Sequence, residues 1–216
     1  MKTKTKEKET LISFVLDETG SMESVKSQTI SGFNEYIETL QKDKTFQKAK
    51  FTLTKFNSEK VEIVHNGVAI GKVAPLTGAT YQPNHTTPLY DAIGCTIQSI
   101  KSKGSILMVI QTDGQENASI EFTQRSIFDM IAEKKKEGWT FAFLGADMDA
   151  YAVSNAIGIP KGNTANYTNS KIDGAMRGLA EASINHNMRG FVQSDEFFKD
   201  VKVDTPKKKT PKAKTG

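Results

Sequence analysis

The sequence predicts an α/β domain with a doubly wound, mostly parallel sheet of six strands, helices on both faces and an antiparallel edge hairpin. Short apolar runs that suit buried strands alternate with longer stretches in which apolar residues recur at helical spacing. The chain has 216 residues, of which 37% are apolar, and this suits one domain of ordinary size. An Asn66-Gly67 pair, a strong hairpin signal, lies between two strand-like segments.

The chain begins with a buried strand followed by a long helix. Residues 10–16, TLISFVL, form a nearly continuous apolar run, which is typical of a strand covered on both faces. From Met22 to about Leu40 the apolar residues fall at roughly helical spacing. A second strand is expected at 49–57, AKFTLTKFN, where apolar side chains alternate with threonines.

The next segment is expected to form the antiparallel edge of the sheet. The segment NSEK is expected to form a turn. Strands at about 61–65 and 68–73 are then predicted to flank a second turn at Asn66-Gly67. A loop rich in Pro, Gly, Thr and Asn follows at 74–87 and leads into the second half of the chain.

The second half alternates strands with helices, which is the order that produces a parallel sheet with both faces covered. Buried strands are expected at 105–112 and 139–146, with a short edge strand in NTANYT. The helices expected here are 88–102, which starts at Pro88, then about 121–136, 147–157 and 171–190.

The charge is concentrated in the two ends of the chain. Of the net charge of +4, residues 1–9 carry +2 and residues 204–216 carry +4, so the body between them carries −2. We therefore expect a charged extension at 1–9, one domain at 10–193, and a C-terminal segment at 194–216 that ends in a disordered Lys-rich tail. Contact with nucleic acid is expected only weakly, through that tail.

Composition also indicates where the protein works. No apolar run approaches the roughly 20 residues of a membrane-spanning helix, and acidic residues stand where a cleaved signal has small ones. The single cysteine, Cys95, cannot form an internal disulfide and lies in a helical pattern, so we expect a thiol in the core. These features predict a cytoplasmic protein without a membrane partner.

Three loops carry hydroxyl and carboxylate side chains where strands end or helices begin. Asp17, Thr19 and Ser21 follow the first strand, Thr87 precedes Pro88, and Asp113 follows the strand at 105–112. In a doubly wound sheet, ligands bind outside the carboxyl ends of the strands where the strand order reverses. With the strand order 3-2-1-4-5-6 these loops converge, and oxygen ligands without His or Cys suit a hard cation such as Mg²⁺.

Other polar residues near the loops have simpler interpretations. Glu18, Glu23 and Glu116 lie next to the cluster and could tune it without binding the ion, but as single acids at helix starts they are expected to complement helix dipoles. Asp91 is expected to cap a helix or complement its dipole, and Asp147 and Asp149 are expected to start a helix. The histidines have no partner histidine at helical spacing, so a zinc site is not expected at His65, His85 or His186. Trp139 is expected in the core of the sheet.

Taken together, the motifs resemble the von Willebrand factor type A (vWA) domain, whose metal ion-dependent adhesion site is written D-x-S-x-S, then T, then D. The matching segments are DETGS at 17–21, the second Thr of TTPLYDAIG and the Asp of TDG. GFNEYI, QTDGQENAS and GWTFAFLGADMDA look like a stand-alone bacterial and phage branch of that family. The resemblance covers most of residues 10–190. Thr19 replaces the first Ser and retains the hydroxyl, whereas residues 84–86 stand where relatives often carry glycine.

The resemblance implies a vWA, Rossmann-like three-layer sandwich that binds Mg²⁺ or Mn²⁺. Thr19, Ser21 and Thr87 would offer hydroxyls to the ion, while Asp17 and Asp113 would act largely through bound waters. It also implies a binding module without catalytic residues, whose partner protein supplies an Asp or Glu carboxylate to the metal.

Two other functions stay open at this point. A strand followed by DETGS superficially resembles the haloacid dehalogenase phosphatases, so a Mg²⁺-dependent phosphoryl-transfer enzyme is one alternative. That family uses D-x-D, however, and Thr19 stands where its second carboxylate is required. The other alternative keeps the fold without a metal, as a structural or decoy subunit recognised through its surface.

Overall fold

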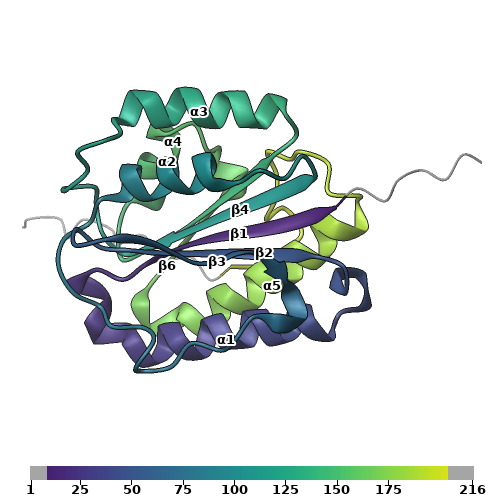
Figure 1. Cartoon of the computed structure of the whole chain (residues 1–216), viewed down its shortest axis with the longest axis horizontal. Coiled ribbons are helices and arrows are strands. Elements are labelled where there is room, and N and C mark those ends of the chain that lie inside the picture. The colour runs from purple at the N-terminus through teal and green to yellow at the C-terminus, as the bar shows by residue number, and fades with distance from the viewer. Residues whose placement is uncertain (1–8, 204–216) are drawn as a thin grey trace, which may run out of the picture.

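A computed structural model describes residues 9–203, so the predicted Lys-rich tail lies outside the described residues. The described chain forms three layers, with a six-stranded sheet between two layers of helices (Figure 1). One face is covered by α1 (Lys26–Lys42) and α5 (Ile172–Met188). The other face is covered by α2 (Leu89–Ser99), α3 (Gln124–Lys136) and α4 (Ala150–Ala156).

The strand order confirms the predicted doubly wound sheet. The strands are β1 (Thr10–Asp17), β2 (Lys50–Phe56), β3 (Val61–Ala69), β4 (Ser105–Thr112), β5 (Thr140–Ala146) and β6 (Thr164–Tyr167). Their order is β3-β2-β1-β4-β5-β6, and β3 alone runs antiparallel to its neighbour. The order reverses between β1 and β4, so the loops that follow these two strands leave the sheet side by side.

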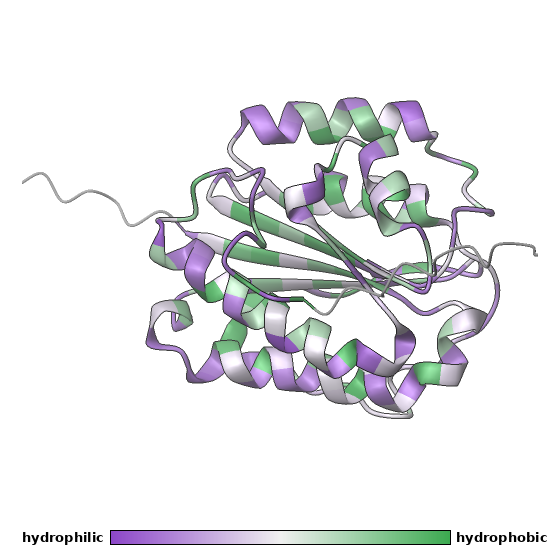
Figure 2. Cartoon of the chain, turned by 180° about the vertical axis from the view of Figure 1, so that it is seen from behind, coloured by the Kyte–Doolittle hydropathy of each residue, from purple (hydrophilic) through white to green (hydrophobic). Residues whose placement is uncertain are grey.

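The apolar runs of the sequence become the two cores of the domain. In β1, Phe14 faces α1, where its ring centroid lies 5.4 Å from that of Phe33, and Val15 faces the opposite core. Successive strand residues point to opposite faces, and an internal strand therefore needs apolar side chains at nearly every position. Figure 2 shows this pattern as hydrophobic strands between helices that expose their polar sides.

The antiparallel edge is present, but its predicted division into strands at 61–65 and 68–73 is wrong. The hairpin turn lies at NSEK, where the Asn57 and Lys60 backbones bond each other at 3.0 and 3.2 Å. Asn66 and Gly67 lie inside the continuous strand β3, and residues 70–72 form a 3-10 turn. The register shifts between Phe51 and Leu53, where β3 has one extra residue, and Gly67 has a φ of 64°. Asn66 and Gly67 therefore form a β-bulge, and the bulge requires the positive φ of glycine just as a hairpin turn would.

The predicted helices are present, and three details around them differ from the expectation or add to it. The first begins as a 3-10 turn, Gly20–Val25, before α1 continues. Cys95 is half-buried rather than in the core, because its side of α2 faces Glu121, whose Oε2 is 3.8 Å from the thiol sulfur. Beyond α5, the chain folds back and buries Phe197 and Phe198. No helix in residues 9–203 is long and apolar enough to cross a membrane.

Candidate metal centre

Asp17, the last residue of β1, is completely buried and lies at the centre of the predicted site. Its Oδ1 accepts a hydrogen bond of 2.8 Å from the Thr19 N–H. Its Oδ2 accepts one of 2.5 Å from the hydroxyl of Thr112, the last residue of β4. The carboxylate is thus fixed between the ends of two neighbouring parallel strands.

The hydroxyls of the first loop face the third loop. Ser21 Oγ donates a 2.5 Å hydrogen bond to Asp113 Oδ1, and Thr19 Oγ1 lies 3.2 Å from Ser21 Oγ. Thr19 occupies the N-cap position of the 3-10 turn, but its side chain makes no capping hydrogen bond. A hydroxyl at this position usually caps the helix. Here it turns toward Ser21 instead, whose hydroxyl bonds the Asp113 carboxylate.

Thr87 joins the second loop to the third. Its N–H donates to Asn117 Oδ1 at 2.8 Å, and the Asn117 N–H donates back to the Thr87 carbonyl at 3.0 Å. The Thr87 hydroxyl lies so close to Gly114 that a Cβ added there would be 2.8 Å from Oγ1. Gly114 therefore lets the threonine approach the residue that follows Asp113. All five predicted residues lie in these three contacting loops, although their ligation of a metal stays a prediction.

Burial dominates the electrostatics of the two carboxylates. It raises the pKa of Asp17 to about 6, against the hydrogen bonds from Thr112 and Thr19, and the Asp113 charge adds to the rise. Burial also raises the pKa of Asp113, while the Ser21 hydrogen bond opposes this change. In the described part of the chain, neither carboxylate forms an ion pair with a lysine or arginine. A bound divalent cation would supply the missing positive charge.

The donor set suits a hard cation. Across residues 9–203, no three side chains of the His, Cys, Asp and Glu types lie together as a metal site. The converging loops instead offer two carboxylates and three hydroxyls, all of them oxygen donors. Oxygen donors with few carboxylates are typical of sites that hold Mg²⁺ or Mn²⁺ with part of its water retained.

Sequence reasoning missed two neighbours of Asp113. The Asn169 side chain bonds Asp113 and lowers its pKa, whereas the charge of Asp147 raises it. The Asn169 N–H in turn donates to Asp147 Oδ2 at 3.1 Å. Both residues follow strands on the β5–β6 side of the sheet. Only the strand order brings them here, because no motif links these two positions with Asp113 in the sequence.

Asp149 caps α4 as expected, accepting the Ala152 N–H at 3.1 Å, whereas two other acids bond neighbouring segments. Asp91 lies in the first turn of α2 but does not cap it, because its carboxylate accepts the N–H groups of Ile120, Glu121 and Phe122 at 2.8 to 3.0 Å. Glu116 bonds the Tyr90 N–H at 2.9 Å and also closes its own turn. These bonds fix the loop after Asp113 to the start of α2.

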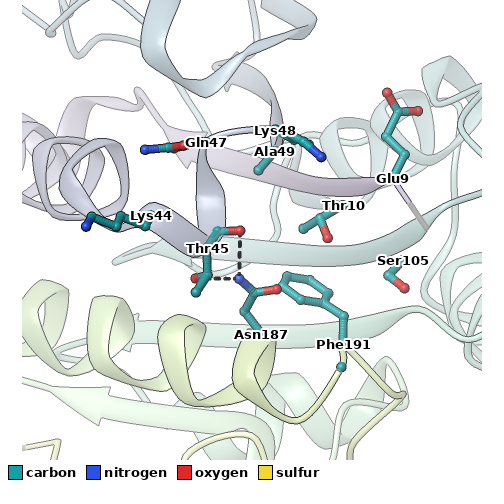
Figure 3. A pocket seen from close by; sticks show the side chains of 11 residues that line it. Glu9, Thr10, Lys44, Thr45, Gln47, Lys48, Ala49, Ser105, Asn187 and Phe191 are labelled. Carbon is teal, nitrogen blue, oxygen red and sulfur yellow. Dashed lines mark hydrogen bonds between the residues drawn. The ribbon is translucent and has the colours of Figure 1, made fainter. Parts of the chain in front are cut away.

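Of two hollows on the described surface, the smaller adjoins the candidate site. The larger, of about 670 Å³, opens at the amino ends of β1 and β4, where Asn187 Nδ2 bonds Thr45 Oγ1 at 2.7 Å (Figure 3). None of the five predicted residues lines it. The smaller, of about 370 Å³, lies beside the first two loops and is lined by Glu18, Lys55 and Asn84, among others.

Comparison with known proteins gives structural matches but no sequence match. No family model and no curated protein matches the sequence. Proximal thread matrix protein 1 from the mussel byssus, solved with a zinc-occupied MIDAS motif, is 14% identical with a TM-score of 0.55. That alignment covers 79% of this chain and 47% of the mussel protein, so this chain spans about half of its length.

Two further solved structures share the fold. A von Willebrand factor type A structure from Catenulispora acidiphila is 11% identical, with a TM-score of 0.51, covering 82% of this chain and 43% of that one. Manganese-loaded TRAP protein from Plasmodium vivax is 13% identical, with a TM-score of 0.52, covering 77% of this chain and 71% of that one. Together with the strand order and the three converging loops, these matches show that the chain has a vWA-like fold.

Proposed function

We propose that the chain is a metal-dependent binding module that holds Mg²⁺ or Mn²⁺ at the carboxyl edge of its sheet and docks a partner protein there. The observation that carries this proposal is the convergence of three loops on one buried carboxylate, one half-buried carboxylate and three hydroxyls. The metal-holding residues would be Asp17, Thr19, Ser21, Thr87 and Asp113. The zinc-occupied and manganese-loaded relatives support a divalent ion at such an edge.

The expected ligand of this module is an Asp or Glu side chain of the partner. Thr19, Ser21 and Thr87 would offer neutral oxygens, while Asp17 and Asp113 would act largely through water. A bound ion with these ligands would retain positive charge and supply a Lewis-acidic position for an incoming carboxylate. Hydrogen bonds hold Asp17 and Ser21 in place before any ligand arrives, which lowers the ordering cost of binding.

We favour binding over catalysis because of the chemistry of the first loop. A phosphatase of the D-x-D type needs a second carboxylate two residues after the first, and Thr19 occupies that position. The Thr19 hydroxyl instead bonds the Asp17 carboxylate and lies 3.2 Å from Ser21 Oγ, so it belongs to the same hydrogen-bonded cluster.

Calorimetric titration with Mn²⁺ tests the metal site. The wild-type chain is expected to bind one ion, and Asp113→Ala is expected to weaken binding sharply. Asp129→Ala is a matched control, because Asp129 pairs with Arg125 on the exposed side of α3. Equal binding by wild type and Asp113→Ala would contradict the site. Metal-dependent hydrolysis of generic phosphate esters, lost in Asp17→Asn, would favour the phosphoryl-transfer alternative.

A further inference from the structure

Glu18 and Lys55 form a buried ion pair directly beside the proposed metal residues. The Lys55 ammonium donates to both Glu18 carboxylate oxygens, at 3.0 and 3.1 Å. The Lys55 side chain is 8% exposed and that of Glu18 is 5% exposed. Glu18 stands between Asp17 and Thr19, and Lys55 lies on β2 in register with Leu16. Burying two charges carries a desolvation cost that the pair only partly offsets.

Outside a longer contact of 3.8 Å between Lys55 Nζ and Glu62 Oε2 on β3, and a bond of the Glu18 N–H to the Phe56 carbonyl, the bonds of the two residues go to one segment, residues 80–84. Lys55 Nζ donates to the Thr80 carbonyl at 2.7 Å, and the Gln82 N–H donates to Glu18 Oε1 at 2.6 Å. The Asn84 N–H donates to the Glu18 carbonyl at 3.0 Å. The pair therefore satisfies backbone groups of a segment that has no helix or strand of its own.

The same segment carries the chain to Thr87. Immediately after it, the carbonyl of His85 accepts the Gly20 N–H at 2.9 Å, and a Cβ on Gly20 would be 3.3 Å from that oxygen. Within it, the Tyr81 hydroxyl donates to the Asp17 carbonyl at 2.6 Å. We therefore expect the distance between Thr87 and the first loop to depend on the hydrogen bonds that fix the backbone of residues 80–84.

We propose that the Glu18–Lys55 pair is a positioning device that sets the distance between the first loop and Thr87, and thereby the metal affinity of the site. This inference rests on the proposed metal-binding function and assigns neither residue as a ligand. Glu18 and Lys55 act through the backbone of residues 80–84. Residues that hold metal ligands in place without touching the ion alter metal affinity by about 10- to 100-fold when they are removed.

A purely electrostatic role for the pair predicts a different outcome. If only the charges mattered, removing the negative charge of Glu18 would weaken cation binding, while removing the positive charge of Lys55 would strengthen it. Positioning predicts that both changes weaken binding, because each releases part of the same segment. The sign of the Lys55 effect therefore separates the two roles.

The experiment is a calorimetric titration of the full chain with Mn²⁺ alone, at a temperature where each variant is folded. Glu18→Gln and Lys55→Met are both expected to lose about 10-fold or more in affinity. Tyr36→Phe is the matched control, because it removes a buried hydroxyl whose hydrogen bond to Ser183 joins α1 to α5. It should lower the thermal midpoint without changing Mn²⁺ affinity, so that instability alone is excluded as the cause.

If Lys55→Met does not fold, Lys55→Arg distinguishes the positioning role from the electrostatic role. It keeps the positive charge but changes the length and shape of the donor, so positioning predicts weaker Mn²⁺ binding and a charge effect predicts none. Unchanged affinity in Glu18→Gln, or tighter binding in Lys55→Met, would overturn the inference while leaving the metal site intact. If the wild-type chain binds no Mn²⁺, the metal site itself is wrong and the inference fails with it.

Discussion

The Thr112 hydroxyl donates a 2.5 Å hydrogen bond to Asp17 Oδ2, joining the carboxyl ends of β4 and β1. The same hydroxyl accepts the Gly114 N–H at 3.0 Å. One threonine therefore links the first acid of the site to the loop that carries the second, at the point where the strand order reverses.

Thr112→Val should lower both stability and metal affinity. The change keeps the shape of the side chain but leaves a buried carboxylate without one donor, which costs about 1–3 kcal/mol of unfolding free energy. The lost hydrogen bond also raises the pKa of Asp17 further, so less of the charged form is present to attract a cation. Urea unfolding and Mn²⁺ titration check the two effects.

Thr96→Val is a suitable control for that experiment. Its hydroxyl is also buried, and it bonds Thr54 Oγ1 at 2.9 Å on the α2 face of the sheet. It should lower stability and leave Mn²⁺ affinity unchanged. Wild-type affinity in Thr112→Val would show that the Thr112–Asp17 bond has no part in the site.

Gly114→Ala should weaken metal binding through a steric effect. The added Cβ would lie 2.8 Å from Thr87 Oγ1, closer than such atoms normally approach, so Thr87 must move. Gly78→Ala places a Cβ in open space and is the matched control. Mn²⁺ titration of both variants is expected to show a loss for Gly114→Ala alone, and equal affinities would place the Thr87 hydroxyl outside the ligand set.

Thr87→Ala should reduce partner binding more than it reduces fold stability. The change removes one proposed ligand at a loop, without opening a cavity in either core. Proteins that an immobilised chain retains in Mg²⁺ should be released by EDTA and should not be retained by Thr87→Ala. Thr87→Ser, which keeps the hydroxyl, should retain them. A partner that survives both chelation and Thr87→Ala would show that recognition occurs elsewhere on the surface.

His186 should make the metal-free chain less stable in mild acid. Its side chain is buried against Phe191 and Phe197, and burial, aided by the nearby Arg189 charge, lowers its pKa to about 4. The unfolded chain takes up a proton near pH 6.5, so it binds more protons than the folded chain between about pH 6.5 and 4. Stability contributed by the neutral imidazole is therefore complete above this window and falls as the pH decreases through it, by at most about 3 kcal/mol.

Replacing His186 by Phe should remove this loss of stability in acid from the pH profile, whereas the raised pKa of Asp17 contributes a slope of the opposite sign in both proteins. Urea unfolding in EDTA at about pH 7 and about pH 5 measures the slope for wild type and His186→Phe. Equal slopes for wild type and His186→Phe would contradict the assignment.

The sequence by itself determined the layers of this protein and the residues of its candidate site. An apolar run such as TLISFVL has few alternatives to a strand buried on both faces, and helical spacing between such runs requires a parallel sheet. Parallel strands end at the same edge, so the edge on which Asp17 and Asp113 lie was predictable from chain order. Their proximity also required β1 and β4 to be neighbours, as they are in the strand order 3-2-1-4-5-6.

Only the tertiary structure decided features that depend on contacts between distant segments. Asn66-Gly67 favours a positive φ, and both a turn and a bulge satisfy that preference; pairing of β3 with β2 selected the bulge. Likewise, Glu18 looked like a helix-dipole residue, and the expectation was wrong because β2 places the Lys55 ammonium 3.0 Å from its carboxylate. Local sequence determines backbone preference and side-chain chemistry. The partner of a buried charge, in contrast, is determined by which residues the packing of the sheet places beside it.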